Sequence, residues 1–288
     1  MPELPEVETV RRGLAPAMEG ARLTRVEVRD RRLRWPIAKD FEKRITGKTV
    51  AGLGRRAKYL LADLSSGDVL VMHLGMSGSF RVGAEAQIAK YHHEKSKSTK
   101  HDHVVFHMSN GSTVTFNDPR RFGSMKLVAR AKLEQEPQLA SLGPEPLGNE
   151  FDAAMLAQAC RAKKTSLKAA LSDQCVVAGL GNIYVCEALY RAHLSPKRQA
   201  STIAERNGKP NARAVALVDA IKSVLNDAIK AGGSSLRDHR RADGTLGDFQ
   251  HKFQVYDREG APCPSCKGKI KRIVQTGRST FYCPRCQK

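Results

Sequence analysis

The sequence contains no apolar run that approaches the roughly 18 residues needed to cross a lipid bilayer. It also lacks an internal repeat and a sustained low-complexity tract. It begins Met1-Pro2-Glu3, without the basic and apolar regions of a secretory signal peptide. These absences argue against a membrane-spanning or secreted protein, and we expect a soluble, cytoplasmic one.

Acidic residues are scarce relative to basic ones. The chain has 29 Asp and Glu against 49 Lys and Arg, which gives a formal net charge of +20. Since 41% of the residues are hydrophobic, the chain is not a disordered basic tail, and its 288 residues favour two domains. A compact protein with this charge favours a polyanionic partner, most commonly nucleic acid. An anionic membrane is less favoured without an amphipathic anchor.

The seven cysteines do not suit a disulfide framework, because four of them lie close to the C-terminus as Cys263-x-x-Cys266 and Cys283-x-x-Cys286. Two such pairs separated by 16 residues are typical of a structural zinc site with four thiolate ligands and an intervening hairpin. Redox dithiols are the alternative, but the βαβ setting that they require is absent. We expect the other three cysteines to be core residues: Cys160, Cys175 and Cys186.

Hydrophobic periodicity changes along the chain. Apolar residues recur every three or four positions over residues 2–18, which predicts an amphipathic helix. Short β-rich runs over residues 23–128 predict a sandwich or barrel of antiparallel strands. A segment with three prolines, residues 134–150, suits an interdomain connection, and helical patterns follow over residues 151–231. Residues 232–249 are rich in Gly, Ser and charge, and we expect a mobile loop there.

The N-terminus offers a nucleophile. Removal of Met1 by an aminopeptidase would leave Pro2 with a free secondary amine, and an α-amino group has a pKa near about 7.7 to 8.0. Such an amine can attack a sugar carbon and form an iminium, while Glu3 moves protons. The alternative is purely structural, because Glu3, Glu6 and Glu8 also suit the positive end of a helix dipole.

Five segments then follow one another in a distinctive order. They are PELPEVET at residues 2–9, HLGMSG at 73–78, NDPRRFG at 117–123, GLGNIY at 179–184 and the terminal zinc ribbon. Together they resemble the formamidopyrimidine-DNA glycosylase family, bacterial repair enzymes for oxidised purines. The resemblance covers essentially the whole chain. Leu4 distinguishes this branch from the endonuclease-VIII-like branch, which has Gly at that place.

The resemblance implies an α+β multidomain fold: an N-terminal catalytic β-sandwich with an N-terminal helix, then a helix-two-turn-helix domain with a zinc-ribbon hairpin. The expected boundaries are residues 1–134 for the catalytic domain, 135–150 for the linker, 151–250 for the helical domain with a lesion-capping loop at 242–249, and 251–288 for the zinc ribbon. It also implies a monomer that acts on double-stranded DNA containing oxidised purines or abasic sites. One structural Zn²⁺ is the expected cofactor, with no redox or nucleotide cofactor.

The catalytic residues that the resemblance implies are Pro2, Glu3 and Lys58. Pro2 would attack the anomeric carbon, Glu3 would protonate the ring oxygen, and β- and δ-elimination would cut the strand on both sides of the lesion. Glu6 matches a further family residue near the site, although a capping role explains it nearly as well. Lys58 would grip a phosphate at the lesion; by itself it would be a solvated charge.

The same resemblance assigns a trio to the space that an extruded nucleotide leaves. An apolar wedge must replace lost stacking, and a donor-rich side chain must engage the unpaired cytosine. Met76 would fill the space, Phe122 would form the wedge and Arg120 would read the partner base. A core position is the alternative for Met76, but its Gly-Met-Ser-Gly context argues against it.

Further DNA contacts are expected from His73, Lys168, Asn182 and Arg278. A buried imidazole is the alternative for His73, and an exposed helix lysine for Lys168. The Gly-rich turn before Asn182 is a weak nucleotide-binding signal, but such a turn at a helix start suits a phosphate. Arg278 lies in the zinc hairpin, where seven Lys and Arg and no acidic residue follow Glu259.

Two alternatives to this function stay open. A non-enzymatic zinc-ribbon protein would bind DNA without cleaving it, and a glycosylase of the same fold could act on oxidised pyrimidines. Three histidines with even spacing could share a strand face and hold a second metal, although no carboxylate or thiolate pattern accompanies them: His101, His103 and His107. Residues 91–100 before them suggest a charged surface excursion.

Overall fold

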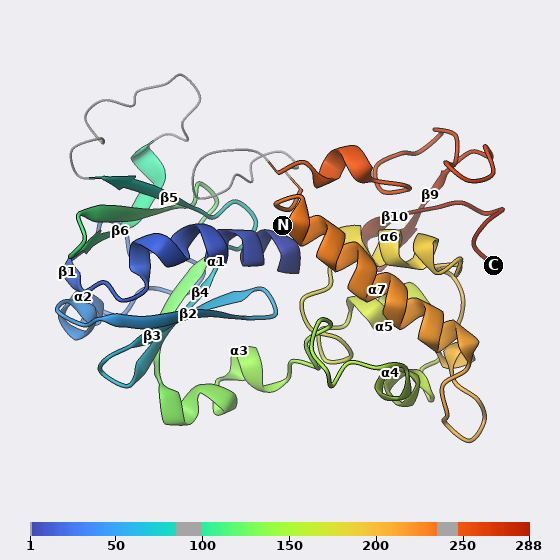
Figure 1. Cartoon of the computed structure of the whole chain (residues 1–288), viewed down its shortest axis with the longest axis horizontal. Coiled ribbons are helices and arrows are strands. Elements are labelled where there is room, and N and C mark those ends of the chain that lie inside the picture. The colour runs from blue at the N-terminus through green and yellow to red at the C-terminus, as the bar shows by residue number, and fades with distance from the viewer. Residues whose placement is uncertain (1, 85–98, 235–246) are drawn as a thin grey trace. The chain divides into compact units, whose positions relative to one another are not determined.

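The structure is a computed structural model that describes residues 2–84, 99–234 and 247–288 (Figure 1). It divides into two compact units. The first comprises Met1–Ala140 and Ala231–Asp248, and the second comprises Ser141–Lys230 and Phe249–Lys288. The expected surface excursion and lesion-capping loop lie largely outside the described residues.

The first unit is a β-sandwich of two antiparallel four-stranded sheets, ordered β1-β6-β7-β5 and β2-β3-β4-β8. The strands of the first sheet are β1 (Leu23–Val28), β5 (Ser79–Ala84), β6 (Asp102–Met108) and β7 (Ser112–Asn117). Those of the second are β2 (Val50–Arg56), β3 (Tyr59–Leu64), β4 (Asp68–His73) and β8 (Ser124–Ala129). The predicted antiparallel sandwich is confirmed.

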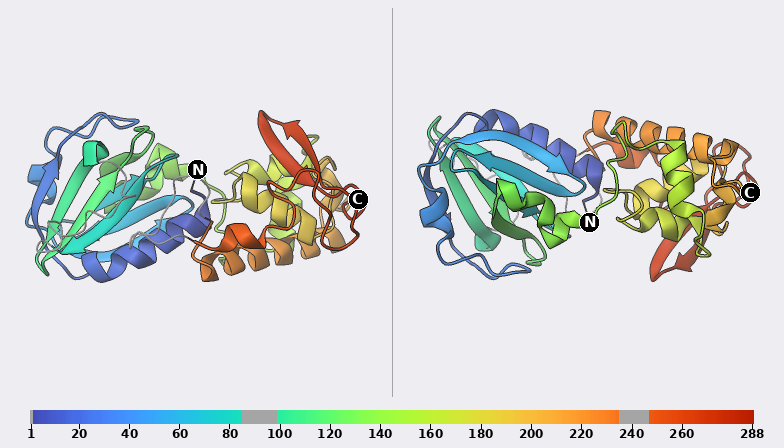
Figure 2. Two further views of the ribbon diagram at one scale, coloured as in Figure 1. Left: turned by 90° about the horizontal axis from the view of Figure 1, so that it is seen from above. Right: turned by 90° about the horizontal axis from the view of Figure 1, so that it is seen from below.

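Helix α1 (Leu4–Met18) packs against strands of both sheets, and Figure 2 shows it lying alongside the sandwich. Its buried face follows the predicted spacing, with Val7, Val10 and Leu14 in the same core as Phe106 of β6. The helix begins two residues later than predicted. Glu3 is its N-cap, so Pro2 precedes the helix.

Short helices complete the first unit: α2 (Phe41–Ile45), the 3₁₀ turns η1 (Thr99–His101) and η2 (Arg130–Gln135), and α3 (Pro137–Ala140). The break between the two units, after Ala140, falls within the predicted linker. The unit that holds the sandwich also includes residues 231–234, 247 and 248, which the resemblance places in the helical domain. A direct cause is visible at Ser234, whose backbone N–H and hydroxyl both donate to Glu6 of α1.

The second unit is helical and ends in a β-hairpin. Its helices are α4 (Ala153–Cys160), α5 (Leu167–Ser172), α6 (Asn182–Arg191) and α7 (Ala212–Lys230), with 3₁₀ turns η3 (Ala200–Ile203) and η4 (Phe249–Lys252). The hairpin pairs β9 (Lys271–Gln275) with β10 (Arg278–Tyr282). Helix α6 packs against α5, α7 and β10, and eight of its ten residues are buried. It is the central helix of this unit.

The three isolated cysteines differ from the expectation in one case. Cys160 and Cys186 are buried, but Cys175 is exposed. Its backbone N–H donates to the Asp173 carboxylate at 3.0 Å in the turn after α5. The position is therefore set by turn formation and not by core packing. Among the described residues, no helix is long and apolar enough to span a membrane.

Candidate active site and zinc centre

The N-terminal segment places two carboxylates at the start of α1. Glu3 and Glu6 form a reciprocal capping box: the Glu3 side chain accepts from the Glu6 backbone, and the Glu3 N–H donates to Glu6 Oε2 at 2.8 Å. The other Glu6 oxygen accepts from the backbone N–H and the hydroxyl of Ser234 at 2.8 and 3.0 Å. Pro2 and Glu3 are both buried. The residue after the predicted nucleophile is thus held in a defined orientation.

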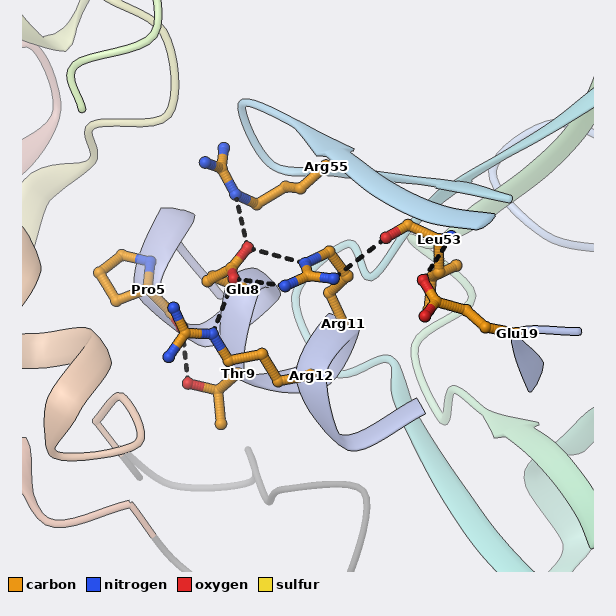
Figure 3. A network of polar contacts seen from close by, with 8 residues as sticks. All are labelled: Pro5, Glu8, Thr9, Arg11, Arg12, Glu19, Leu53 and Arg55. Atoms are coloured by element: carbon orange, nitrogen blue, oxygen red, sulfur yellow. Dashed lines mark hydrogen bonds and ion pairs between the residues drawn. The ribbon is translucent and has the colours of Figure 1, made fainter. Parts of the chain in front are cut away.

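One turn further along α1, Glu8 joins the helix to β2 (Figure 3). It accepts hydrogen bonds from Arg11, Arg12 and Arg55 at 2.8 to 3.3 Å. Burial alone would raise the pKa of Glu8, but the hydrogen bonds and charges of these arginines outweigh it and lower the pKa to about 2. Glu8 therefore stays ionised at neutral pH and anchors α1 to the sandwich.

Lys58 lies in the two-residue turn of the β2–β3 hairpin. The preceding residue, Ala57, has a φ of 52°, as tight hairpin turns require. The Ala57 carbonyl accepts a hydrogen bond from the Arg55 guanidinium at 3.0 Å. Lys58 is only 7% exposed. The alternative of an ordinary solvated lysine is therefore wrong.

His73 pairs with Tyr59 across β3 and β4, with ring centroids 4.8 Å apart. Burial and the positive charges of Lys58 and Arg34 lower the pKa of His73 to about 4, so the ring is neutral at physiological pH. Its Nδ1 lies 3.0 Å from the Gly75 backbone N–H and accepts from it, which leaves the proton on Nε2. His73 is thus a neutral hydrogen-bond donor close to Lys58.

Met76 and Phe122 are exposed apolar side chains on the loops after β4 and β7. Each is 43% exposed, which rules out the core position that was the alternative for Met76. The Arg120 guanidinium lies over the Phe122 ring at 4.7 Å from its centroid. The structure therefore brings this trio together on the surface of the first unit.

The remaining predicted DNA contacts lie in the second unit. Lys168 is fully buried on α5, so the alternative of an exposed helix lysine is wrong. Asn182 begins α6, and its side-chain N–H donates to the Ser279 carbonyl of β10 at 2.8 Å. Arg278 begins β10 after the tight turn at Thr276 and Gly277, where both residues have positive φ, and it is exposed.

The four C-terminal cysteines form one cluster. Their ligand atoms all lie within 4.8 Å of one another, with Cys263 and Cys286 Sγ atoms 3.7 Å apart and those of Cys266 and Cys283 3.5 Å apart. A tetrahedral site with Zn–S bonds of about 2.3 Å requires S···S distances of about 3.8 Å. The cluster therefore fits one Zn²⁺ ion, and four thiolates leave no coordination position open for chemistry. The predicted zinc ligands are confirmed.

Side chains outside the cysteines orient this cluster. The Tyr190 hydroxyl lies 3.3 Å from Cys263 Sγ and 2.8 Å from the Ser265 hydroxyl. Burial raises the pKa of Cys263, but the Tyr190 hydrogen bond and backbone N–H groups outweigh it and lower the pKa to about 6. The Cys263 thiolate is thus favoured, whereas burial raises the pKa of Cys283 and Cys286, whose thiols lose their protons when a metal binds.

Glu187 of α6 is a buried carboxylate, missed by the sequence analysis, that holds the segment leading to the zinc hairpin. It is fully buried and accepts from the backbone N–H groups of Gln254, Val255 and Tyr256 at 2.8 to 3.1 Å. Burial raises the pKa of its carboxyl group, and these hydrogen bonds oppose that effect. Nothing local in the sequence marks it, because its partners are 67 to 69 positions away.

The sequence analysis also passed over a basic segment that its composition marks. Residues 29–35, RDRRLRW, combine four arginines with the single tryptophan. Trp35 is 46% exposed with the Arg34 guanidinium 5.0 Å from its ring, and the Arg34 N–H donates to Gly123 O beside the predicted trio. Arginine next to an exposed aromatic side chain is typical of nucleic-acid surfaces.

The three histidines do not form a metal site. His103 is buried with Nε2 on the Asp118 carbonyl, and His107 Nε2 contacts Glu27 at 2.9 Å. His101 lies in η1, before a register shift in β6. In the part of the chain that the structure describes, the cysteine quartet is the only potential metal-binding cluster of this kind.

Comparisons with known proteins match this architecture along the whole chain. Three family models match: the formamidopyrimidine-DNA glycosylase N-terminal domain at residues 1–125, the corresponding H2TH domain at 142–240, and a zinc finger found in FPG and IleRS at 260–288. The formamidopyrimidine-DNA glycosylase of Afipia carboxidovorans is 69% identical over all of both chains.

Solved structures give the same result. A Lactococcus lactis Fpg complex with abasic-site DNA is 32% identical, covers 100% of both chains and has a TM-score of 0.85. A MutM complex with DNA containing carbocyclic 8-oxo-G is 33% identical, with the same coverage and a TM-score of 0.84. The sandwich, the helical domain and the cysteine cluster thus define a DNA glycosylase with a zinc finger. More narrowly, the chain belongs to the formamidopyrimidine-DNA glycosylase family.

Proposed function

We propose that this chain is a bifunctional DNA glycosylase and AP lyase of base excision repair that excises oxidised purines, 8-oxoguanine and formamidopyrimidines, from double-stranded DNA. The observation that carries the proposal is the arrangement at the start of α1, where Pro2 precedes Glu3, the N-cap residue held by a capping box with Glu6. Family membership and relatives solved with abasic-site and 8-oxo-G DNA support it. We further propose a monomer that works in the cytoplasm on nucleoid DNA.

The proposed reaction requires that Met1 be removed. The free amine of Pro2 attacks C1′ of the damaged nucleotide, and the N-glycosidic bond breaks as the base leaves with the bonding electrons. Glu3 gives a proton to the ring oxygen, so the sugar opens and an iminium forms. A base removes a C2′ proton, the C–H electron pair moves into the iminium to give an enamine, and these electrons expel the 3′ phosphate. Loss of a C4′ proton in the same way expels the 5′ phosphate, and hydrolysis of the remaining iminium regenerates Pro2.

The other predicted site residues fit binding roles in this proposal. Lys58 provides a buried cation, and His73 provides a neutral Nε2–H donor; both suit a phosphate. Asn182 and Arg278 are proposed to contact the damaged strand from the second unit. Lys168 is fully buried, so its proposed contact requires that the side chain become exposed when DNA binds. When bound, the zinc ion has a structural role only, because Cys263, Cys266, Cys283 and Cys286 fill its coordination shell.

Borohydride trapping on a duplex with 8-oxoguanine opposite cytosine tests the proposal. Intact mass should first show that Met1 is absent. We expect one covalent protein–DNA adduct, mapped to Pro2, and none on undamaged duplex. Glu3→Gln should bind the lesion duplex like native protein and lose most base release, whereas Glu134→Gln, an exposed carboxylate in η2, is the matched control.

The outcomes separate the three functions. Binding without adduct or cleavage by protein lacking Met1 would indicate a non-enzymatic DNA-binding protein. Better excision of oxidised thymine than of 8-oxoguanine would indicate a pyrimidine-directed enzyme. An adduct on a lysine in place of Pro2 would refute the proposed nucleophile.

A further inference from the structure

One buried carboxylate lies between the two loops that carry Met76, Arg120 and Phe122. We call these the wedge loops: residues 74–78 between β4 and β5, and residues 118–123 between β7 and β8. The carboxylate belongs to Asp118, which is 0% exposed. It has no role in the chemistry proposed above, yet it contacts both loops.

Asp118 accepts three hydrogen bonds through its carboxylate. The Ser77 hydroxyl and the Arg120 backbone N–H donate to Oδ1, the latter at 3.3 Å, and the Gly123 backbone N–H donates to Oδ2 at 2.8 Å. Ser77 also accepts from the Arg120 N–H at 3.2 Å. The carboxylate therefore ties the residue after Met76 to Arg120 and to the residue after Phe122.

Backbone packing makes the two wedge loops one rigid piece. Gly75 has a φ of 61°, and a Cβ there would lie 2.3 Å from the Phe122 carbonyl carbon. The backbones thus approach so closely that only glycine fits. The Asp118 carbonyl in turn accepts from Nε2 of the buried His103 at 2.8 Å.

The second wedge loop is also braced from outside. The Gly123 carbonyl accepts from the Arg34 N–H at 3.0 Å, and the Arg121 guanidinium donates to Asp30 at 2.6 Å. Arg121 adopts a φ of 57°, which is unfavourable for a non-glycine residue and persists only where the surroundings fix it. Arg121 is committed to an ion pair, whereas Arg120 presents its guanidinium over Phe122.

We propose that Asp118 is a positioning residue that fixes the wedge loops in their DNA-inserting geometry before DNA binds. Side chains that must replace a lost base need a defined position, and loops ordered in advance do not lose conformational entropy on binding. Asp118 thereby sets both the rate of base extrusion and the preference for the opposite base. This inference rests on the proposed glycosylase function and on the assignment of the trio to the vacated space.

The test uses Asp118→Asn and Ser77→Ala in the full-length zinc-containing protein. Asn is nearly isosteric but replaces one acceptor oxygen with a donor, which opposes a backbone N–H. Asp68→Asn is the matched control, because that carboxylate accepts from Arg44 at 3.0 Å in a partly exposed ion pair away from the wedge loops. Single-turnover excision is measured for 8-oxoguanine opposite cytosine and opposite adenine, with cleavage of an abasic duplex in parallel.

We expect Asp118→Asn to slow 8-oxoguanine excision opposite cytosine about 10- to 100-fold and to reduce the cytosine-to-adenine ratio at least threefold. Cleavage at the abasic site should change less than about threefold, since no base must be extruded. Ser77→Ala should shift the same two readouts in the same direction by a smaller factor, and it decides the question if Asp118→Asn does not fold.

The inference is overturned if the folded variants excise 8-oxoguanine with the native rate and the native cytosine-to-adenine ratio. It is also overturned if 8-oxoguanine excision and abasic cleavage fall by the same factor, because that pattern indicates general loss of structure. Failure of the proposed function is distinct, since the native protein and Asp68→Asn would then also leave 8-oxoguanine in place.

Discussion

The wedge loops of the first unit and the zinc hairpin of the second both carry, on short turns, side chains that we propose contact DNA, but they are stabilised differently. The wedge loops stand on a large sandwich core that includes Phe80, Phe106 and Phe116. The hairpin rests on a small cluster in which three of seven buried residues are cysteines. Where the core is large, hydrogen bonds suffice to set a loop; where it is small, a metal ion must replace the missing apolar contacts.

The largest effect is therefore expected from the metal site. Cys283→Ser should abolish zinc binding and lower DNA affinity at least 100-fold, because structural zinc contributes about 10 to 16 kcal/mol to folding of small zinc domains. Zinc content by mass spectrometry and titration of lesion DNA at fixed salt measure both. Cys175→Ser, at an exposed cysteine outside the cluster, is the control and should match native protein. Retained stoichiometric zinc in Cys283→Ser would contradict the ligand assignment.

The next effect concerns the trio on the wedge loops. Met76→Ala and Phe122→Ala remove apolar surface that we propose replaces the lost base stacking. Stacking is worth a few kcal/mol per unstacked step, so excision should slow about 10- to 100-fold opposite any base. Arg120→Ala should instead reduce the preference for cytosine over adenine opposite 8-oxoguanine. Excision against all four opposite bases measures both effects.

Abasic duplex serves as the internal control for these variants, because it has no base to extrude. Equal losses on abasic and 8-oxoguanine duplexes would argue against a void-filling role for Met76 and Phe122. An unchanged cytosine-to-adenine ratio in Arg120→Ala would leave that arginine as a phosphate contact.

The same comparison explains what the sequence could predict. The sandwich and α1 follow from local periodicity, and the zinc ligands follow from two short motifs with regular spacing. Burial of Lys58 and Lys168 could not be predicted, since a lysine is ordinarily exposed and only tertiary contacts enclose it. The segment around Asp118 predicts an ordinary turn residue. Its role in joining two loops could not be predicted, because its partner Ser77 is 41 positions away in the sequence.

A smaller effect is expected from the anchor between α1 and β2. The pKa of Glu8 is lowered from 4.5 to about 2 in the folded protein, so its contribution is complete above pH 4.5 and is lost as the pH falls towards 2. Glu8→Gln should lower the free energy of unfolding by about 2 to 3 kcal/mol at pH 7. The free energy of unfolding of this variant should also fall less than that of native protein when the pH is lowered. Urea unfolding at pH 7 and pH 3 measures this, with Glu134→Gln as the exposed control. Equal losses at both pH values would exclude the ion-pair explanation.

The smallest effect is expected at the hydroxyl of Tyr190, which contacts Cys263 at the zinc cluster. Tyr190→Phe keeps the ring in its apolar cluster and removes only the hydroxyl, at a cost of about 1 kcal/mol for the lost hydrogen bonds. Groups that hydrogen-bond metal ligands typically change metal affinity about 10- to 100-fold, so zinc transfer to a chromogenic chelator should be about tenfold faster. Tyr282→Phe is the control. Tyr282 directly precedes the zinc ligand Cys283, but its hydroxyl has no hydrogen bond among the described residues. Equal rates of zinc release from the two variants would show that the Tyr190 hydroxyl does not stabilise the Cys263 thiolate. The contribution of Tyr190 to the zinc hairpin would then come from packing of its ring alone.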